Sequence, residues 1–245
     1  MHEDFFSEFQ KLVEEVKGFL YYHLQMGVEI PSTASDGQEM SRILEVMIEN
    51  LSVKNKPSHP DAITLEGVRR ELGDCTRCEL STSRKNIVFG KGNPYASLVF
   101  VGEAPGKEED LAGEPFVGEA GQLLTRIIHA INLRREDVYI TNVIKCRPPR
   151  NRDPEPGEVQ ACFPFLQKQL QAIRPRIICA LGNFAAQSLL ETTEKISSLR
   201  GKMYELPLFW VVPTFHPASL LRNPQWKREV WHDVQLIQKF LEGSD

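Results

Sequence analysis

Cysteines are the residues of this chain that most plainly could do chemistry, and there are five of them. Cys75 and Cys78 flank two residues in the sequence Cys-Thr-Arg-Cys, a spacing that lets two thiolates face one metal site. Cys146 and Cys162 are candidates for the remaining ligands. A pair with this spacing also occurs in redox-active dithiols. Cys179 lies in the apolar run Ile-Ile-Cys-Ala-Leu, so we expect it in the hydrophobic core.

A second group of reactive side chains lies in or just after short apolar runs. Glu103, Asn142 and His216 each stand at the end of such a run, and Phe116 lies in a loop. Carboxylates and imidazoles commonly move protons in enzymes, and a buried amide needs partners for its donors and its acceptor. Glu103 and His216 would equally suit structural roles in turns, and Phe116 would suit the core. Their placement in the fold therefore decides between these interpretations.

The elements that must position these residues follow from the hydrophobic pattern. Near-continuous apolar runs, typical of strands buried on both faces, alternate with segments of helical length. The runs cover residues 98–102, 138–144, 176–182 and 209–213, and the helical segments cover 121–133, 157–173, 183–190 and 224–241. With right-handed crossovers, this order predicts an α/β fold of three layers (αβα) around a four-stranded, mostly parallel central sheet. Ligands of such sheets bind beyond the carboxyl ends of the strands, so we expect the site there.

The N-terminal quarter differs from the rest of the chain. Residues 5–26 carry apolar side chains at helical spacing, and a second helix is possible at residues 38–51. We therefore predict an N-terminal helical extension over residues 1–60 and a main domain over residues 61–245. The extension contains no functional motif, and we favour a solvated appendage over a partner-docking arm as its role.

Composition and charge narrow the class of protein. The chain is 41% hydrophobic and 25% charged, without a run long enough to span a bilayer, and its acidic start does not resemble a secretion signal. We expect a cytoplasmic monomer without a membrane partner. Residues 1–60 hold ten acidic and five basic residues, so the net charge of −4 is negative because of them, and residues 61–245 carry a small positive charge. Beyond them, basic residues gather in two groups that suit a nucleic acid, namely Lys145, Arg147, Arg150 and Arg152, then Arg200, Lys202, Arg222, Lys227 and Arg228.

Several short motifs, taken in order, resemble those of the iron–sulfur, or type 4, uracil-DNA glycosylases. They are Gly-Glu-Ala-Pro-Gly at 102–106 with Glu109 and Asp110, Pro-Phe-Val-Gly at 115–118, Tyr-Ile-Thr-Asn at 139–142, Lys-Cys-Arg-Pro-Pro at 145–149, Arg-Gly-Lys at 200–202 and His-Pro-Ala at 216–218. The resemblance covers about residues 65–241. It implies a DNA-repair enzyme that flips uracil out of single- or double-stranded DNA and hydrolyses its N-glycosidic bond, giving free uracil and an abasic site.

The same resemblance implies a [4Fe-4S] cluster held by Cys75, Cys78, Cys146 and Cys162. Cysteine spacing alone would also permit zinc. We expect the cluster to have a structural role, because Cys146 and Cys162 bracket the basic loop 147–157 and the cluster would hold this loop in place against DNA.

The resemblance assigns the chemistry to two residues. Glu103 would position or deprotonate the attacking water and stabilise the cationic sugar, with Glu109 and Asp110 as rivals for this role. His216, as a neutral imidazole, would donate a hydrogen bond to O2 of the departing uracil anion.

Recognition of the base is assigned to a further group. Phe116 would stack on the flipped ring, and the amide of Asn142 would pair with uracil O4 and N3–H, a pattern that cytosine does not present. Ala104 and Gly106 belong to the first motif, whose loop would exclude the methyl group of thymine.

Contacts with DNA are expected from residues outside the base pocket. Phosphates would be held by Arg147, Arg150, Arg152, Arg222 and Lys227, which makes binding salt-dependent. Leu220, four residues after His216, suits an apolar wedge that fills the vacated stack, although a core position in a short helix is nearly as good an interpretation.

Two other functions fit the sequence less well. A relative that becomes trapped covalently on uracil-DNA uses a histidine in an inserted basic loop, but no histidine lies between His129 and His216 and no insertion follows Cys146. A non-catalytic DNA-binding module would use the cluster only as a staple and would not need the set of Glu103, Asn142 and His216. The enzyme is therefore the favoured interpretation.

Overall fold

The computed structural model of this chain describes residues 63–243. The helical extension predicted for residues 1–60 lies outside the described residues. Within 63–243, no helix has both the length and the apolar character that crossing a bilayer requires.

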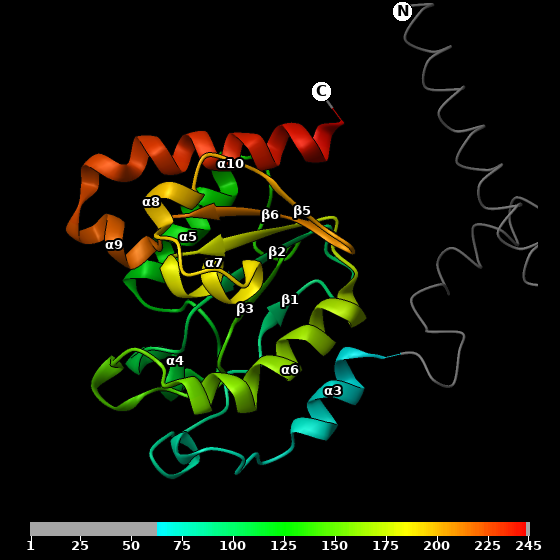
Figure 1. Cartoon of the computed structure of the whole chain (residues 1–245), viewed down its shortest axis with the longest axis vertical. Helices are drawn as coiled ribbons and strands as arrows, with labels where there is room; N and C mark the ends of the chain where they lie inside the picture. Colours follow the sequence, from blue (N-terminus) through cyan, green and yellow to red (C-terminus); the bar gives the residue numbers. More distant parts are fainter. Residues whose placement is uncertain (1–62, 244–245) are drawn as a thin grey trace, which may run out of the picture. The chain divides into compact units, whose positions relative to one another are not determined.

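One sheet of six strands forms the centre of the fold, in the order β1-β3-β2-β4-β6-β5 (Figure 1). Its strands are β1 (Lys91–Gly92), β2 (Leu98–Gly102), β3 (Tyr139–Asn142), β4 (Ile177–Leu181), β5 (Tyr204–Leu206) and β6 (Phe209–Thr214). The inner strands β3, β2, β4 and β6 are parallel to one another. They correspond to the apolar runs of the sequence, and they are buried because helices cover both of their faces.

The sheet was predicted to have four strands, and this number was wrong, because the sheet has six. Strands β1 and β5 pair antiparallel with β3 and β6 and extend the sheet at both edges. Both are short and exposed or half-buried, so they lack the apolar run that marks an inner strand.

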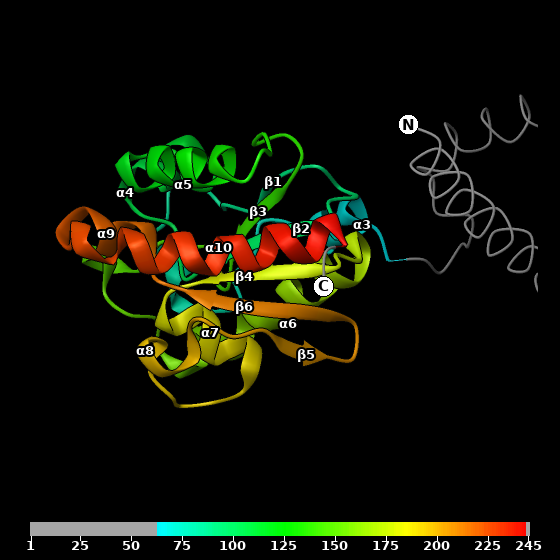
Figure 2. The same ribbon diagram turned by 90° about the horizontal axis from the view of Figure 1, so that it is seen from above.

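Helices cover both faces of the sheet, as the three-layer prediction requires (Figure 2). Alternate strand residues point to opposite faces: Val99 and Ile178 pack in one core cluster, while Phe100 and Cys179 pack in the other. Helices α6 (Pro156–Ile173) and α7 (Asn183–Leu190) bury their apolar side chains in the first cluster. Helices α5 (Glu119–Ala130) and α10 (Lys227–Glu242) do so in the second.

Shorter helices complete the domain. They are α3 (Leu65–Leu72), α4 (Lys107–Ala112), α8 (Ile196–Leu199), α9 (Pro217–Arg222) and the 3₁₀ turns Glu79–Thr82, Pro149–Asn151 and Pro224–Trp226. Helix α10 begins three residues later than the sequence pattern indicated, because the 3₁₀ turn takes up its predicted first residues.

The register of the sheet brings the strand ends to one edge. Gly102 at the end of β2 pairs with Asn142 at the end of β3, and Leu181 at the end of β4 pairs with Thr214 at the end of β6. The residues that follow these strands therefore meet at the carboxyl edge, where ligands of parallel sheets bind.

Candidate active site

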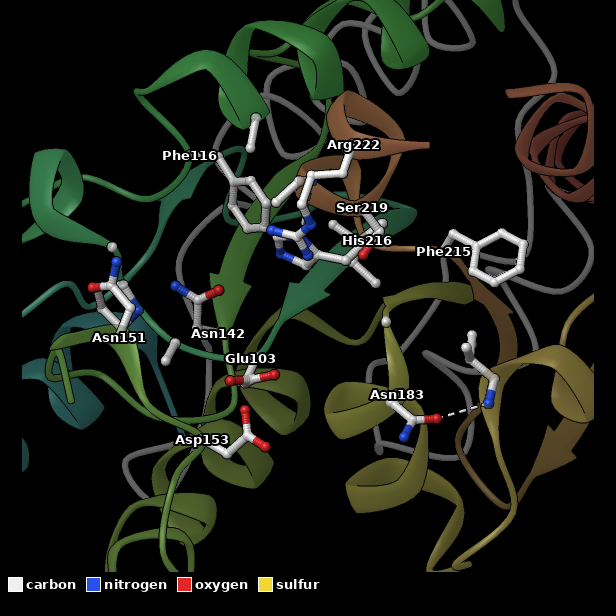
Figure 3. A pocket seen from close by; sticks show the side chains of 18 of the residues that line it. Glu103, Phe116, Asn142, Asn151, Asp153, Asn183, Phe215, His216, Ser219 and Arg222 are labelled. Carbon is white, nitrogen blue, oxygen red and sulfur yellow. Dashed lines mark hydrogen bonds between the residues drawn. The ribbon is translucent and has the colours of Figure 1, made fainter. Parts of the chain in front are cut away.

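A cavity of about 920 Å³ opens at this edge of the sheet. Its walls come from the ends of the parallel strands, from α4, α5 and α9, and from the loop after β3 (Figure 3). The residues predicted for chemistry and recognition that line it are Glu103, Ala104, Gly106, Phe116, Asn142 and His216. The fold thus brings these predicted residues together, although they are far apart in the sequence.

Asn142 lies at the back of the cavity with an unused acceptor. The residue is 1% exposed, and its Oδ1 has no hydrogen-bond partner within residues 63–243. A buried oxygen without a donor costs free energy, on the order of 1–3 kcal/mol. This oxygen is therefore suited to accept an N–H group of a bound ligand.

The backbone around Asn142 is held firmly. The buried Lys145 donates from Nζ to the Asn142 carbonyl oxygen at 2.6 Å and to Thr141 Oγ1 at 2.8 Å. On the neighbouring strand, a Cβ at Gly102 would collide with Asn142 Oδ1 and with the Phe116 ring. Glycine at position 102 therefore keeps the space beside the amide free.

Phe116 is held in a costly backbone conformation, with φ of 52° in a residue other than glycine. Arg135 Nη2 donates to the Phe116 carbonyl oxygen at 2.9 Å and to that of Pro115 at 2.7 Å. The Phe116 and His216 ring centroids are 5.4 Å apart with an interplanar angle of 31°. The loop thus fixes an aromatic ring beside both His216 and the Asn142 amide, an arrangement that suits a flat ligand.

Glu103 carries a carboxyl group with a shifted pKa. Burial, aided by the nearby Asp153 carboxylate, raises the pKa of Glu103 to about 7. Figure 3 shows the two carboxyl groups next to each other at the cavity wall. A carboxyl group with a pKa near neutral pH is well suited to act as a general base.

The two rival carboxylates have structural partners instead. Glu109 accepts backbone N–H groups from Gly106, Val117 and Gly118 at 3.0–3.2 Å, so it ties the first motif to the Phe116 loop. Asp110 is 3% exposed and accepts from the backbone of Lys85 and Asn86. The geometry therefore favours Glu103 over both rivals for handling water.

His216 presents one ring nitrogen to the cavity as a donor. Its Nδ1 accepts the backbone N–H of Ala218 at 3.1 Å, which leaves the proton of the neutral ring on Nε2. Burial, together with the positive charge of Arg222, lowers the pKa of His216 to about 4. The ring is thus neutral at physiological pH.

Leu220 does not have the exposure that a wedge needs. The side chain is 1% exposed and belongs to the core cluster under α5 and α10, so the prediction of a wedge at this position was wrong. Its neighbour Leu221 is 42% exposed. One residue along a helix turns the side chain by about 100°, which is enough to exchange a core position for a surface one.

The basic residues fall into two groups. Arg222 is exposed and lines the cavity, and Arg150 is exposed in the loop after β3. Arg147 donates from Nε to Asn151 Oδ1 at 2.7 Å, which leaves its other donors for a ligand. Arg152 instead forms an ion pair with Glu158 at 2.6 Å, so its charge is balanced within the protein and stabilises the loop.

The four predicted ligand cysteines, Cys75, Cys78, Cys146 and Cys162, line a second, smaller cavity. Cations surround it. Arg77 donates to Cys75 Sγ at 3.3 Å and Arg84 to Cys146 Sγ at 3.6 Å, and the wholly buried Lys145 lies beside Cys146 and Cys162. No three His, Cys, Asp or Glu side chains of residues 63–243 could hold a single metal ion as they stand. Cys179 is fully buried in the core, as predicted.

Asp153 and Trp226 are among the residues of the large cavity that the sequence did not single out. They reach it from the loop after β3 and from the turn before α10. No local motif marks either residue, because both acquire their importance from side chains that are distant in the sequence.

Comparisons with known proteins place the chain in one family. Residues 89–235 match the uracil DNA glycosylase superfamily. The chain is 50% identical over 183 residues to a type-4 uracil-DNA glycosylase of Archaeoglobus fulgidus, covering 71% of this chain and 92% of that protein. It is 45% identical over 189 residues to one of Saccharolobus solfataricus (74% and 88%), and 44% identical over 186 residues to one of Thermotoga maritima (73% and 95%). The matched region includes Glu103, Asn142 and His216.

Proposed function

This chain belongs to the uracil DNA glycosylase superfamily as a type-4 uracil-DNA glycosylase, and from that premise we propose how it removes uracil from DNA. A uracil flipped out of the strand enters the cavity, its N-glycosidic bond is hydrolysed, and free uracil and an abasic site result. The observation that carries the proposal is the buried Asn142 Oδ1 without a partner, beside a fixed aromatic ring.

Recognition of uracil rests on complementary hydrogen bonds. Asn142 Oδ1 accepts from uracil N3–H, and its Nδ2 donates to O4. Phe116 stacks on the flat ring and replaces the stacking that flipping removes. Cytosine presents an acceptor at N3 and a donor at N4, so both bonds to the amide are lost. Ala104 and Gly106 line the cavity in the loop that we propose to exclude the thymine methyl group.

The chemical step uses Glu103 and His216. Ionised Glu103 takes a proton from the attacking water as the water oxygen bonds to sugar C1′ and the C1′–N1 bond breaks. The negative charge of Glu103 also stabilises the cationic sugar of the transition state. His216 Nε2–H donates to O2 of the departing uracil anion. The low pKa of His216 keeps it neutral in this role.

Contact with the DNA backbone is assigned to Arg147, Arg150 and Arg222. Arg222 lines the cavity, and the loop that carries Arg147 and Arg150 follows a cavity strand. Neutralising phosphates with these residues makes binding weaken as salt rises. The exposed Leu221 is the apolar side chain that α9 offers to the vacated stack.

A [4Fe-4S] cluster held by Cys75, Cys78, Cys146 and Cys162 is part of the proposal. The residues fit the group, because four thiols line one cavity and three cations, Arg77, Arg84 and Lys145, are placed to balance the negative charge of thiolates. Each thiolate of a four-iron cube binds a different iron, so the thiols need more room between them than around a single ion. The cluster supplies a structural link between the α3 region, the loop after β3 and α6.

Four further properties of the protein are predicted from its sequence. They are the domain boundary near residue 60, the cytoplasmic location, the monomeric state, and action on single- as well as double-stranded DNA. The non-catalytic alternative gains no support from the cavity, since a binding module does not need a carboxyl group with a raised pKa beside a neutral histidine.

The rate of uracil excision is expected to rise with pH through neutrality. Glu103 acts as a base only when ionised, and with a pKa of about 7 it becomes ionised between about pH 6 and 8. His216, with a pKa of about 4, stays neutral over this range and adds no second inflection. Single-turnover excision of uracil from an oligonucleotide, measured from pH 5.5 to 9, checks this expectation.

Two variants sharpen the pH measurement. Asp153→Asn removes the negative charge beside Glu103, so the Glu103 pKa falls and the midpoint moves to lower pH. Glu103→Gln removes the pH dependence and lowers the rate on the order of 100-fold. A wild-type rate that stays flat between pH 6 and 8 would exclude Glu103 as the base.

A further inference from the structure

Two aromatic rings, those of Phe215 and Trp226, stack on each other in the wall of the large cavity. Neither ring has a part in the chemistry proposed above. Phe215 follows β6, Trp226 lies in the turn before α10, and both line the cavity. Their ring centroids are 4.5 Å apart, with an interplanar angle of 15°. Both residues are half-buried, so the pair is part of the accessible wall. Figure 3 shows Phe215 on the opposite side of His216 from Phe116.

A largely buried network lies next to Phe215. Arg200 donates to both Asp233 oxygens at 2.7 and 3.0 Å, and Thr214 Oγ1 donates to Asp233 Oδ2 at 2.6 Å. The Arg200 guanidinium lies 5.7 Å from the centroid of the Phe215 ring. Thr214 and Asp233 are fully buried, so the end of β6 and the ring that follows it are fixed in place. A rigid aromatic surface loses little entropy when a flat group stacks on it.

Two exposed cations line the same cavity as the aromatic pair. They are Lys195 and Arg222, and neither forms an ion pair in the part of the chain that the structure describes. Aromatic rings together with cations that have no acidic partner are the combination that binds single-stranded nucleic acid, in which bases stack on rings and phosphates meet positive charge.

We propose that Trp226, backed by Phe215, is a stacking site for the nucleobase next to the flipped uracil in the same strand. Lys195 and Arg222 hold the phosphates of this segment. The inference rests on the proposed function: Phe116 is taken up by the flipped uracil, and Phe215, on the opposite side of His216, is left for the neighbouring nucleotide. Every base has an aromatic face, so the site accepts any neighbouring base and does not read sequence.

Binding of DNA that lacks one neighbouring base tests the proposal. In the Glu103→Gln background, in which uracil is excised about 100-fold more slowly and so stays in place while binding is measured, affinity is determined by fluorescence anisotropy for a labelled single-stranded oligonucleotide with one uracil. The base 5′ or 3′ of the uracil is present or is replaced by a baseless tetrahydrofuran residue. Removing the stacked base is expected to weaken binding about tenfold.

The same removal is then measured in a Trp226→Leu protein. If the base stacks on Trp226, this substitution itself weakens binding about tenfold, and removing the base then has little further effect, because the two changes delete one interaction. Trp226→Phe, which keeps an aromatic face, should retain most of the affinity. Trp231→Leu is the matched control, since Trp231 is 42% exposed on α10 and does not line the cavity. The Trp231→Leu protein should bind the oligonucleotide as tightly as the parent protein does.

The proposal would be wrong if removing the base and substituting Trp226 had independent effects on the affinity for DNA. If removing either neighbouring base costs the same factor with and without Trp226, or costs nothing in the parent, the proposal is wrong. Circular dichroism checks the fold of each variant, and Trp226→Met replaces Trp226→Leu if the leucine variant unfolds. Failure of the proposed function is a separate result, because it would appear as wild-type protein that releases no uracil, whereas the stacking test reads binding to intact DNA.

Discussion

Asn142→Ala is expected to slow uracil excision on the order of 100-fold or more while the fold and the iron content stay unchanged. The substitution removes both hydrogen bonds to the base, and a site built around such bonds loses most of its recognition without them. The fold is expected to survive because Asn142 Oδ1 has no partner among residues 63–243, so its removal strands no other polar group. Single-turnover rates with saturating enzyme measure the loss, and circular dichroism checks the fold.

Asn142→Asp makes the same test more specific. A carboxylate facing uracil O4 repels it but accepts from the N4 amino group of cytosine, so residual activity should shift toward cytosine or disappear. Oligonucleotides that carry uracil or cytosine at one position compare the two bases directly. Near-normal uracil excision by both variants would place recognition in another residue.

Serine substitution of any one ligand cysteine is expected to remove or destabilise the cluster. Wild-type protein purified without oxygen should be brown, absorb near 400 nm and hold about four iron atoms per chain. Cys146→Ser should lose most of this iron and much of the thermal stability, because the proposed cluster would connect the loop after β3, through Cys146, to the α3 region and α6.

Cys179→Ser is the matched control for the iron measurement. Cys179 is fully buried in the strand core and does not line the cysteine cavity, so its substitution should keep the iron despite a cost of about 1–3 kcal/mol for a buried hydroxyl group. Stoichiometric zinc without iron, in protein made without oxygen, would contradict the cluster.

The inner part of the fold follows from the sequence because burial on both faces leaves a direct mark. The continuous apolar runs around Phe100 and Ile178 could only be satisfied between two layers of helices, and the structure has them there. The edge strands β1 and β5 leave no such mark. The first has only two residues, Lys91 and Gly92, and its pairing depends on β3 already being in place.

The site was predictable where a strand end carries the residue. Glu103 follows β2 and Asn142 ends the adjacent parallel strand β3, so topology alone brings them to one edge. Leu220 was misassigned because residue spacing does not determine which side of α9 meets the core. Asp153 and Trp226 were missed because their roles come from tertiary contacts with Glu103 and Phe215.

Uracil excision itself is the most direct test of the account. A labelled duplex with one uracil opposite guanine is incubated with purified full-length protein and then treated with alkali, which breaks the strand at an abasic site. We expect a break at the uracil with wild-type protein, no break when thymine replaces the uracil, and a rate at least about 100-fold lower with Asn142→Ala. An intact uracil strand after incubation with folded, iron-containing wild-type protein would contradict the proposed function.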